Sequence, residues 1–257
     1  MNPAAQREPW IFPDWPAPVR AAVTTRWGPG QSESPYERMN LGHGGGEPAD
    51  IVEGNRRELV HALGLPHAPR WLRQVHGTRV AQLGPLPQEE VPSADAAVSR
   101  IPGTVLAILS ADCLPVLLAA EDGSEIGAAH AGWRGLAAGV LEATVGSMAS
   151  EPSRLLAWLG PCIGAASYEV DAPVRDAFLQ HDTGAGEAFR ATRPDHWQCD
   201  LAALAIRRLR AAGVTRIHGG GFDTFRDARF YSYRRQGARR GSFATLIWVP
   251  QAERRPG

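Results

Sequence analysis

The chain has 257 residues, with 27 basic and 27 acidic side chains and therefore a formal net charge of zero. All the basic residues are arginine, which excludes a Schiff-base lysine, a lysine general base and a Walker lysine. The balanced charge, with no basic block longer than pairs such as Arg234-Arg235 and Arg239-Arg240, argues against a nucleic-acid partner. No apolar run approaches the ~20 residues that span a bilayer, so no membrane partner is expected.

The cysteines and the N-terminal segment indicate the cellular compartment. Cys113, Cys162 and Cys199 are unevenly spaced and odd in number, so no disulfide framework is expected. Residues 1–18 contain tryptophan, proline and charged side chains but no apolar signal segment. We therefore expect a cytoplasmic protein, monomeric or homodimeric, whose thiols stay reduced and free to bind a metal.

The first half of the chain alternates short apolar runs with one helical pattern. Residues 19–27 predict a strand, and the glycine-rich residues 28–46 predict a long irregular loop. Residues 48–63 carry apolar side chains at near-helical spacing before Gly64 and predict a helix. Further strands are predicted at residues 71–75, 79–83, 105–109 and 114–120.

The second half continues this alternation. Strands are predicted at residues 126–129, 155–159 and 242–249, and helices at residues 136–148 and 201–212, the latter capped by Asp200. The pattern predicts the α/β class, as a single three-layer domain in which helices sandwich a mixed sheet. The expected boundaries are an N-terminal extension at residues 1–18, a catalytic domain at residues 19–250 and a C-terminal tail at residues 251–257.

Three short segments each carry one good transition-metal ligand beside a glycine or a strand end. They are Gln74-Val75-His76-Gly77, Ala111-Asp112-Cys113-Leu114-Pro115 and His130-Ala131-Gly132-Trp133-Arg134-Gly135. Two imidazoles and one thiolate leave a fourth tetrahedral position open, which is typical of catalytic rather than structural zinc. Strand-end side chains converge at a sheet edge, so we expect His76, Cys113 and His130 to meet. Asp112 adds a carboxylate that could orient an imidazole or act as a base.

The same residues allow other chemistries. Cys113 could be a nucleophile, with His130 or His76 as its base and Asp112 as the orienting group. Two histidines and one cysteine also form blue-copper sites, but the eight histidines include no His-x-His pair, which argues against a multicopper site. A cytidine-deaminase-type zinc site would need Pro-Cys-x-x-Cys, of which Pro161-Cys162 supplies only the first half.

The chain resembles one known family along nearly its whole length. The resemblance rests on the three segments above and on Gly160-Pro161-Cys162-Ile163-Gly164, Tyr168-Glu169-Val170, Phe230-Tyr231-Ser232-Tyr233-Arg234-Arg235, Asn40-Leu41-Gly42-His43 and Asn55-Arg56. The family is that of purine nucleoside phosphorylases formerly described as polyphenol oxidases or laccase-domain proteins, and also as peptidoglycan editing factors.

The resemblance implies a three-layer α/β fold and one zinc ion held by His76, Cys113 and His130. It implies phosphorolysis of adenosine, inosine, guanosine and methylthioadenosine, with adenosine deamination as a further activity. The older name implies copper-dependent oxidation of phenols, and the editing name implies removal of wrongly incorporated serine from cell-wall precursors, with Cys113 as a candidate nucleophile. Copper is the less favoured metal, because the histidine pattern does not support it.

Substrate-binding positions follow from the same segments. Arg134 and Arg56 suit phosphate because a guanidinium presents paired donors, although a structural ion pair is an equally open role for each. His43 could donate a proton to the purine, since histidine exchanges protons near neutral pH. Asn40 and Gln74 belong to the matching motifs and are further substrate-binding candidates.

Two positions depart from the family pattern. Asp223-Thr224 stands where many members carry Cys-Thr, and Arg240-Gly241-Ser242 stands where many carry Thr-Gly-Arg. The departures leave the metal ligands intact, but they put the substrate preference in question.

Overall fold

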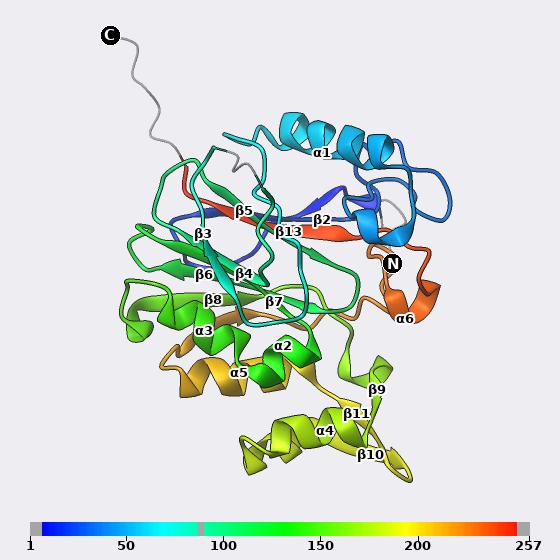
Figure 1. The fold of residues 1–257 in the computed structure, drawn as a ribbon, viewed down its shortest axis with the longest axis vertical. Helices are drawn as coiled ribbons and strands as arrows, with labels where there is room; N and C mark the ends of the chain where they lie inside the picture. The colour runs from blue at the N-terminus through cyan, green and yellow to red at the C-terminus, as the bar shows by residue number, and fades with distance from the viewer. Residues whose placement is uncertain (1–6, 87–89, 251–257) are drawn as a thin grey trace.

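Two β-sheets lie face to face at the centre of the computed structural model, which describes residues 7–86 and 90–250 (Figure 1). The first sheet has four strands in the order β1 (Trp10–Ile11), β2 (Arg20–Thr24), β13 (Phe243–Trp248) and β5 (Val105–Ser110). All its neighbouring strands are antiparallel. The N-terminal segment therefore contributes an edge strand to the sheet that the last strand of the chain also joins.

The second sheet has six strands and is mixed. Its order is β12 (Arg216–Gly219), β8 (Leu155–Leu159), β6 (Leu114–Ala120), β7 (Ile126–Ala131), β4 (Ala96–Ser99) and β3 (Val80–Gln82). The two outer pairs are parallel and the three inner pairs are antiparallel. Strands β6, β7 and β8 are buried along their whole length, which explains their continuous apolar sequence.

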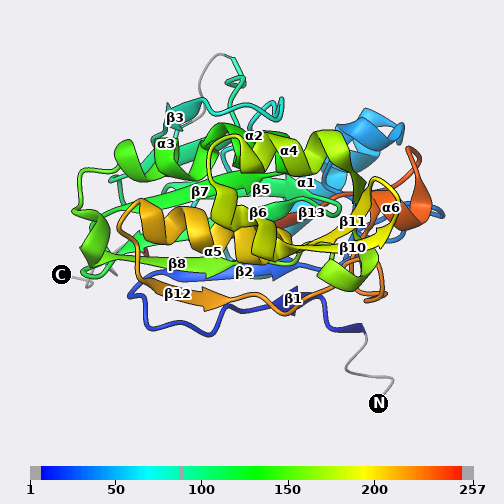
Figure 2. The same ribbon diagram turned by 90° about the horizontal axis from the view of Figure 1, so that it is seen from below.

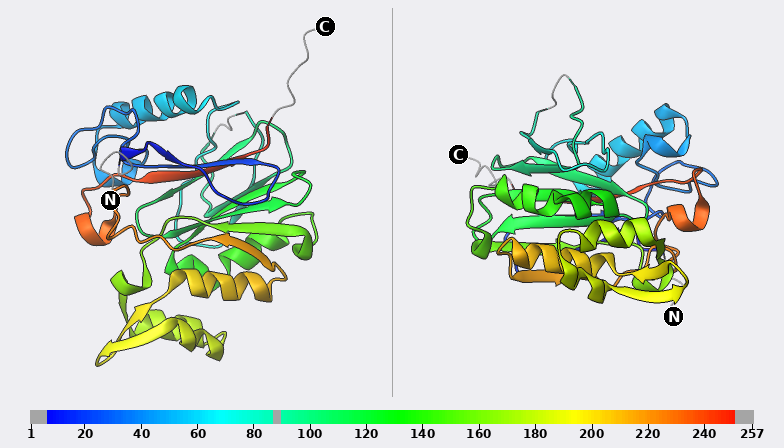
Figure 3. Two further views of the ribbon diagram at one scale, coloured as in Figure 1. Left: turned by 180° about the vertical axis from the view of Figure 1, so that it is seen from behind. Right: turned by 60° about the horizontal axis from the view of Figure 1, so that its bottom comes forward.

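Helices cover the outer face of each sheet (Figures 1 and 2). Helix α1 (Ala49–Leu63) lies on the four-stranded sheet, whereas α2 (Trp133–Ala138), α3 (Val140–Gly146) and α5 (Leu201–Ala211) lie on the six-stranded sheet. A small lobe projects beyond α5, formed by β9 (Glu169–Asp171), α4 (Ala172–Leu179), β10 (Phe189–Arg193) and β11 (His196–Cys199) (Figure 3). Helix α6 (Tyr233–Gln236) precedes β13.

Three hydrophobic cores lie between the two sheets and between each sheet and the helices that cover it. In β6, Leu117 and Ala119 face the core between the two sheets, while Val116 and Leu118 face the core beneath α2, α3 and α5. The third core joins α1, through Leu59, to the outer face of the four-stranded sheet. Because side chains alternate along a strand, one apolar run supplies two cores at once.

The predicted α/β class, with mixed sheet enclosed by helices, is confirmed, and the sheet layer is double. One central sheet was expected, but the structure has two, and the consecutive strands β5 and β6 belong to different sheets. A continuous apolar run signals burial on both faces and does not reveal which neighbour it pairs with.

Two predicted elements differ from the structure. The helix expected at residues 136–148 starts earlier and is divided at Gly139, whose φ of 98° places it in the left-handed region. The strand expected at residues 71–75 is absent from the described residues, where Arg70 and Arg73 make only isolated bridges. The predicted Asp200 cap of α5 is confirmed, since its carboxylate accepts the Ala203 N–H at 2.9 Å.

The expected C-terminal tail, residues 251–257, lies outside the described residues, as do residues 1–6 of the expected N-terminal extension. In the described ranges, no helix combines the length and the apolar character that crossing a membrane requires.

Candidate metal centre

His76, Cys113 and His130 meet at one point, as their sequence context predicts. Their ligand atoms all lie within 4.8 Å of one another, and the Cys113 Sγ lies 3.9 Å from the His76 Nε2. His130 comes from β7, Cys113 from the link between β5 and β6, and His76 from the turn before β3. His130 is buried, Cys113 is half-buried and His76 is exposed, so the cluster opens to solvent on the side of His76.

Cys113 lies where the chain passes from one sheet to the other. Strand β5 ends at Ser110 and β6 begins at Leu114, so three residues cross between the sheets. Asp112 has a φ of 108°, a backbone conformation that non-glycine residues rarely adopt and that is often found at functional sites. The Ser110 hydroxyl donates to the Cys113 carbonyl oxygen and closes this tight turn.

Asp95, which sequence reasoning did not single out, holds two of the three candidate ligands in place. Its carboxylate accepts the backbone N–H groups of Val75, His76 and Gly77 at 3.1, 2.9 and 2.7 Å. The same carboxylate lies 2.9 Å from the His130 Nδ1. A proton on Nδ1 leaves Nε2 as the lone-pair donor, which is how carboxylates orient metal-binding histidines. The available signal was a lone aspartate directly before the apolar strand β4.

Glycines make room for the cluster. A Cβ on Gly132 would lie 2.9 Å from the Cys113 Sγ and 3.0 Å from the His76 Cδ2. A Cβ on Gly135 would lie 2.9 Å from the Gly77 carbonyl oxygen. The start of α2 therefore packs against the His76 turn at a distance that only glycine permits.

The cluster favours a thiolate beside a charged imidazole. Burial opposes ionisation of Cys113, but the charge of His130 and hydrogen bonds from His130 and His76 outweigh it and lower the pKa of Cys113 to about 6. Burial likewise opposes a charged His130, but Cys113 and Asp95 raise the pKa of His130 to about 9. A thiolate is the form of cysteine that binds metals and attacks electrophiles.

Asp112 does not orient an imidazole, contrary to one expected role. Its carboxylate accepts the Thr224 hydroxyl at 2.6 Å and the Arg234 backbone N–H at 2.7 Å. The orienting carboxylate is Asp95. Burial raises the pKa of Asp112 despite these hydrogen bonds, so its role as a base stays a prediction.

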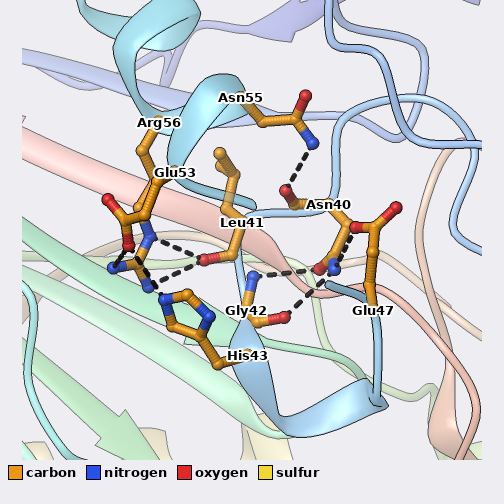
Figure 4. A network of polar contacts seen from close by, with 8 residues as sticks. All are labelled: Asn40, Leu41, Gly42, His43, Glu47, Glu53, Asn55 and Arg56. Atoms are coloured by element: carbon orange, nitrogen blue, oxygen red, sulfur yellow. Dashed lines mark hydrogen bonds and ion pairs between the residues drawn. The ribbon is translucent and has the colours of Figure 1, made fainter. Parts of the chain in front are cut away.

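Asn40, His43 and Arg56 form a second polar group, on the glycine-rich loop and α1 (Figure 4). The Arg56 Nε and Nη2 donate to the Leu41 carbonyl oxygen at 3.0 and 2.9 Å, and its Nη1 donates to Glu53. The Glu53 carboxylate also lies 2.9 Å from the His43 Nε2. Of the two roles left open for Arg56, the structure shows the structural one, since its guanidinium donates to Leu41 and Glu53.

Asn40 and Gln74 also bond to this chain. Asn40 donates to Glu47 and to the Gly42 carbonyl oxygen, and it accepts the N–H groups of Gly42 and Ser242. Gln74 pairs through its side-chain amide with both backbone groups of Leu109 at 2.9 Å. These contacts join the glycine-rich loop to the start of β13 and the residue 74 segment to β5, and a substrate contact for either side chain stays a prediction.

Arg134 and Asp223, the latter at a position that departs from the family pattern, have different surroundings. Arg134 is exposed, and its guanidinium carbon lies 4.4 Å from the centre of the Trp133 ring. Within the described ranges it makes no ion pair. Asp223 accepts the Gly164 N–H and the Ser167 hydroxyl, so it stabilises the loop after β8.

Comparison with known proteins agrees with the motifs. Residues 20–250 match the model of the family described as multi-copper polyphenol oxidoreductase laccase. A Xylella fastidiosa (strain Temecula1 / ATCC 700964) protein named purine nucleoside phosphorylase is 52% identical over 253 residues, which cover 93% of this chain and 97% of the relative. The Escherichia coli (strain K12) purine nucleoside phosphorylase YfiH is 46% identical over 242 residues, covering 93% and 98%.

A solved structure shares the whole fold. The crystal structure of Neisseria meningitidis protein NMB0706 superposes with a TM-score of 0.88 at 38% sequence identity, covering 95% of this chain and 100% of that chain. Since the family model spans almost all described residues and the relatives align from end to end, this chain belongs to the multi-copper polyphenol oxidoreductase laccase family, whose members here include proteins named purine nucleoside phosphorylase.

Proposed function

We propose that this protein is a zinc-dependent purine nucleoside phosphorylase that acts on adenosine, inosine, guanosine and methylthioadenosine. The observation that carries the proposal is the His76–Cys113–His130 cluster, which is open on one side. The printed names of the relatives support the substrate class. We place the reaction in the cytoplasm, where thiols stay reduced.

The residues present fit one zinc ion. Two imidazoles and a readily ionised thiol are a usual donor set for catalytic zinc, and Asp95 orients His130 as a metal ligand requires. In the part of the chain that the structure describes, this is the one group of three or more His, Cys, Asp and Glu side chains with ligand-like spacing. A single ion is favoured over the several coppers that the family description names.

Phosphorolysis breaks the C1′–N9 bond while a phosphate oxygen bonds to C1′. The bonding electrons leave with the purine, and positive charge develops on the ribose. Zinc, when bound, would supply a Lewis acid beside the substrate oxygens. His76, Cys113 and His130 would hold the ion, and His43 would donate a proton to the departing purine.

Arg134 is the proposed phosphate contact on the α2 side of the site. It follows the ligand His130 by four residues and lies exposed on the Trp133 ring. Replacing it by lysine keeps the charge but removes the paired donors. We expect Arg134→Lys to raise the phosphate KM about tenfold with little change in melting temperature. An unchanged phosphate KM with a lowered melting temperature would refute this role.

The decisive experiment is a nucleoside screen on metal-analysed protein, with and without phosphate. We expect free base and ribose 1-phosphate from inosine or adenosine only when phosphate is present. Base release that is equally fast without phosphate would indicate hydrolysis and reject the phosphorylase. Ammonia release from adenosine in the same screen tests the proposed deaminase activity.

A cysteine hydrolase is the second candidate, because Cys113 and His130 also pair as a nucleophile and its base, with Asp95 as the orienting group. Such an enzyme could edit cell-wall precursors. Chelation separates the two, since the hydrolase would keep its activity without metal and the phosphorylase would lose it.

A further inference from the structure

Arg240 contacts both the glycine-rich loop and helix α6. Its carbonyl oxygen packs against Gly45, where a Cβ would come within 1.8 Å of it. Its guanidinium carbon lies 4.9 Å from the centre of the Tyr233 ring of α6. Figure 1 shows α6 and the chain that leads into β13 at the end of the sheets where the glycine-rich loop also lies. Arg240 therefore links the loop that carries His43 to the α6 side of the site.

The guanidinium of Arg240 is near the candidate metal centre. Burial lowers the pKa of Arg240, and Asp112, Tyr233 and Cys113 act in the opposite direction. The contacts of α6 agree with this, because the Tyr233 N–H donates to the Ala111 carbonyl oxygen at 3.3 Å and the Arg234 N–H donates to Asp112 at 2.7 Å. The Tyr233 ring on which Arg240 lies is therefore attached to the turn that carries Cys113. Arginine stays charged even in such surroundings.

Few of the hydrogen-bond donors of Arg240 are used by the described residues. Its Nε is buried and, in the described ranges, has no hydrogen-bond partner. Its Nη1 makes one long contact, to the Ala238 carbonyl oxygen at 3.3 Å. A buried donor without a partner costs free energy, so a charged one points to a ligand that is absent from the free protein.

The neighbouring arginines differ in this respect. Arg234 donates both terminal nitrogens to the Glu169 carbonyl oxygen and stacks on Tyr168. Arg235 donates to the carbonyl oxygens of Thr224, Phe225 and Phe230. Arg56 donates to Leu41. Arg240 is thus the partly buried guanidinium of this region with donors left for an anion.

We propose that Arg240 is a phosphate-binding residue of this site and that it holds the attacking phosphate from the side of the glycine-rich loop, opposite Arg134. The assignment rests on the proposed phosphorylase function. Its guanidinium would give the phosphate oxygens charge-assisted hydrogen bonds from a partly buried position, where such bonds are stronger than in water.

The test compares Arg240→Gln and Arg240→Lys with Arg239→Gln, which removes the exposed neighbouring charge. Kinetics give the phosphate and inosine KM values, and calorimetric titration of inorganic phosphate into zinc-loaded protein gives a Kd. We expect Arg240→Gln to raise the phosphate KM and Kd at least about tenfold and to change the inosine KM less than about twofold. Arg240→Lys should recover part of the loss, and Arg239→Gln should match the wild type.

The outcomes separate the two proposals. If the wild type needs phosphate but Arg240→Gln keeps the wild-type phosphate KM and Kd, the Arg240 assignment is wrong and the proposed phosphorylase function is retained. If the wild type releases base without phosphate, the phosphorylase is wrong, and phosphate binding that persists in Arg240→Gln overturns the assignment as well. Melting temperatures identify a misfolded variant, in which case the milder Arg240→Lys decides by the same phosphate KM and Kd.

Discussion

At the scale of single residues, Asp95 determines how well the candidate metal centre is organised. Burial opposes its charge, but hydrogen bonds from His130 and from the Gly77 and Val75 N–H groups hold the pKa of Asp95 below its usual range. One carboxylate thus fixes the ring of His130 and the backbone of His76.

Asp95→Asn should weaken zinc binding by about 10–100-fold, the usual effect of losing a partner of a ligand. An amide has one acceptor oxygen in place of two, so part of the Val75–Gly77 turn loses its partner. Competition with a chelating dye measures the affinity. Glu125→Gln is the matched control, because that buried carboxylate also accepts backbone N–H groups, from Ala149 and Ser150, away from the cluster. Equal zinc affinity in both variants would contradict the assignment.

Cys113→Ala should release most of the metal, which we expect at about one zinc per chain. Elemental analysis after dialysis measures the stoichiometry. Cys199→Ala serves as the control, since Cys199 is fully buried and burial raises the pKa of its thiol, which disfavours the metal-binding thiolate. Full zinc content in Cys113→Ala would show that the ligand set is wrong.

At the scale of elements, a left-handed glycine divides the helical segment after β7. Gly139 has a φ of 98° and separates α2 from α3, and its N–H donates to the carbonyl oxygens of Gly135 and Leu136. The division lets α2 turn toward the His76 segment while α3 packs on β7.

Gly139→Ala should lower the free energy of unfolding by about 1 kcal/mol or more, because an alanine rarely adopts this φ. Gly54→Ala, in the interior of α1 where a Cβ would meet only the flexible end of Arg57 at 3.9 Å, should instead raise it by up to about 1 kcal/mol. Urea denaturation of the two variants measures both changes. A stabilised Gly139→Ala would mean that the helices can merge.

At the scale of the whole molecule, the core between the two sheets holds together the strands that carry the candidate site. Phe230, which precedes α6, is fully buried there, with its ring centre 5.1 Å from that of Phe243 and 6.0 Å from that of Phe222. This core joins β13 and β5 of one sheet to β6 and β7 of the other, which are the strands that carry or flank Cys113 and His130.

Phe230→Ala should lower the free energy of unfolding by about 3–5 kcal/mol, since it leaves a cavity between the sheets. Phe12→Ala is the control, because that side chain is 65% exposed and its loss should change stability by less than about 0.5 kcal/mol. Thermal or chemical denaturation measures the difference in the free energy of unfolding. Similar values for the two variants would show that Phe230 does not stabilise the core between the sheets.

The sequence alone identified the three candidate metal ligands, the α/β class and most of the strands and helices. His76, Cys113 and His130 lie in short segments whose residue types already indicate a metal site, and this information is local. Strands β6 and β8 and helix α5 follow from hydrophobic periodicity and capping, which act within a few residues of the chain.

Which polar side chains keep hydrogen-bond donors free for a ligand depends on tertiary contacts. Arg56 and Arg240 look alike in the sequence, yet the first donates to the Leu41 carbonyl oxygen, and the second retains a buried donor that has no partner among the described residues. Asp95, rather than Asp112, orients His130 for the same reason, since the partner of a buried polar group comes from a distant segment. The sequence also did not predict the second sheet, because an apolar strand indicates burial on both faces but does not identify the neighbouring strands.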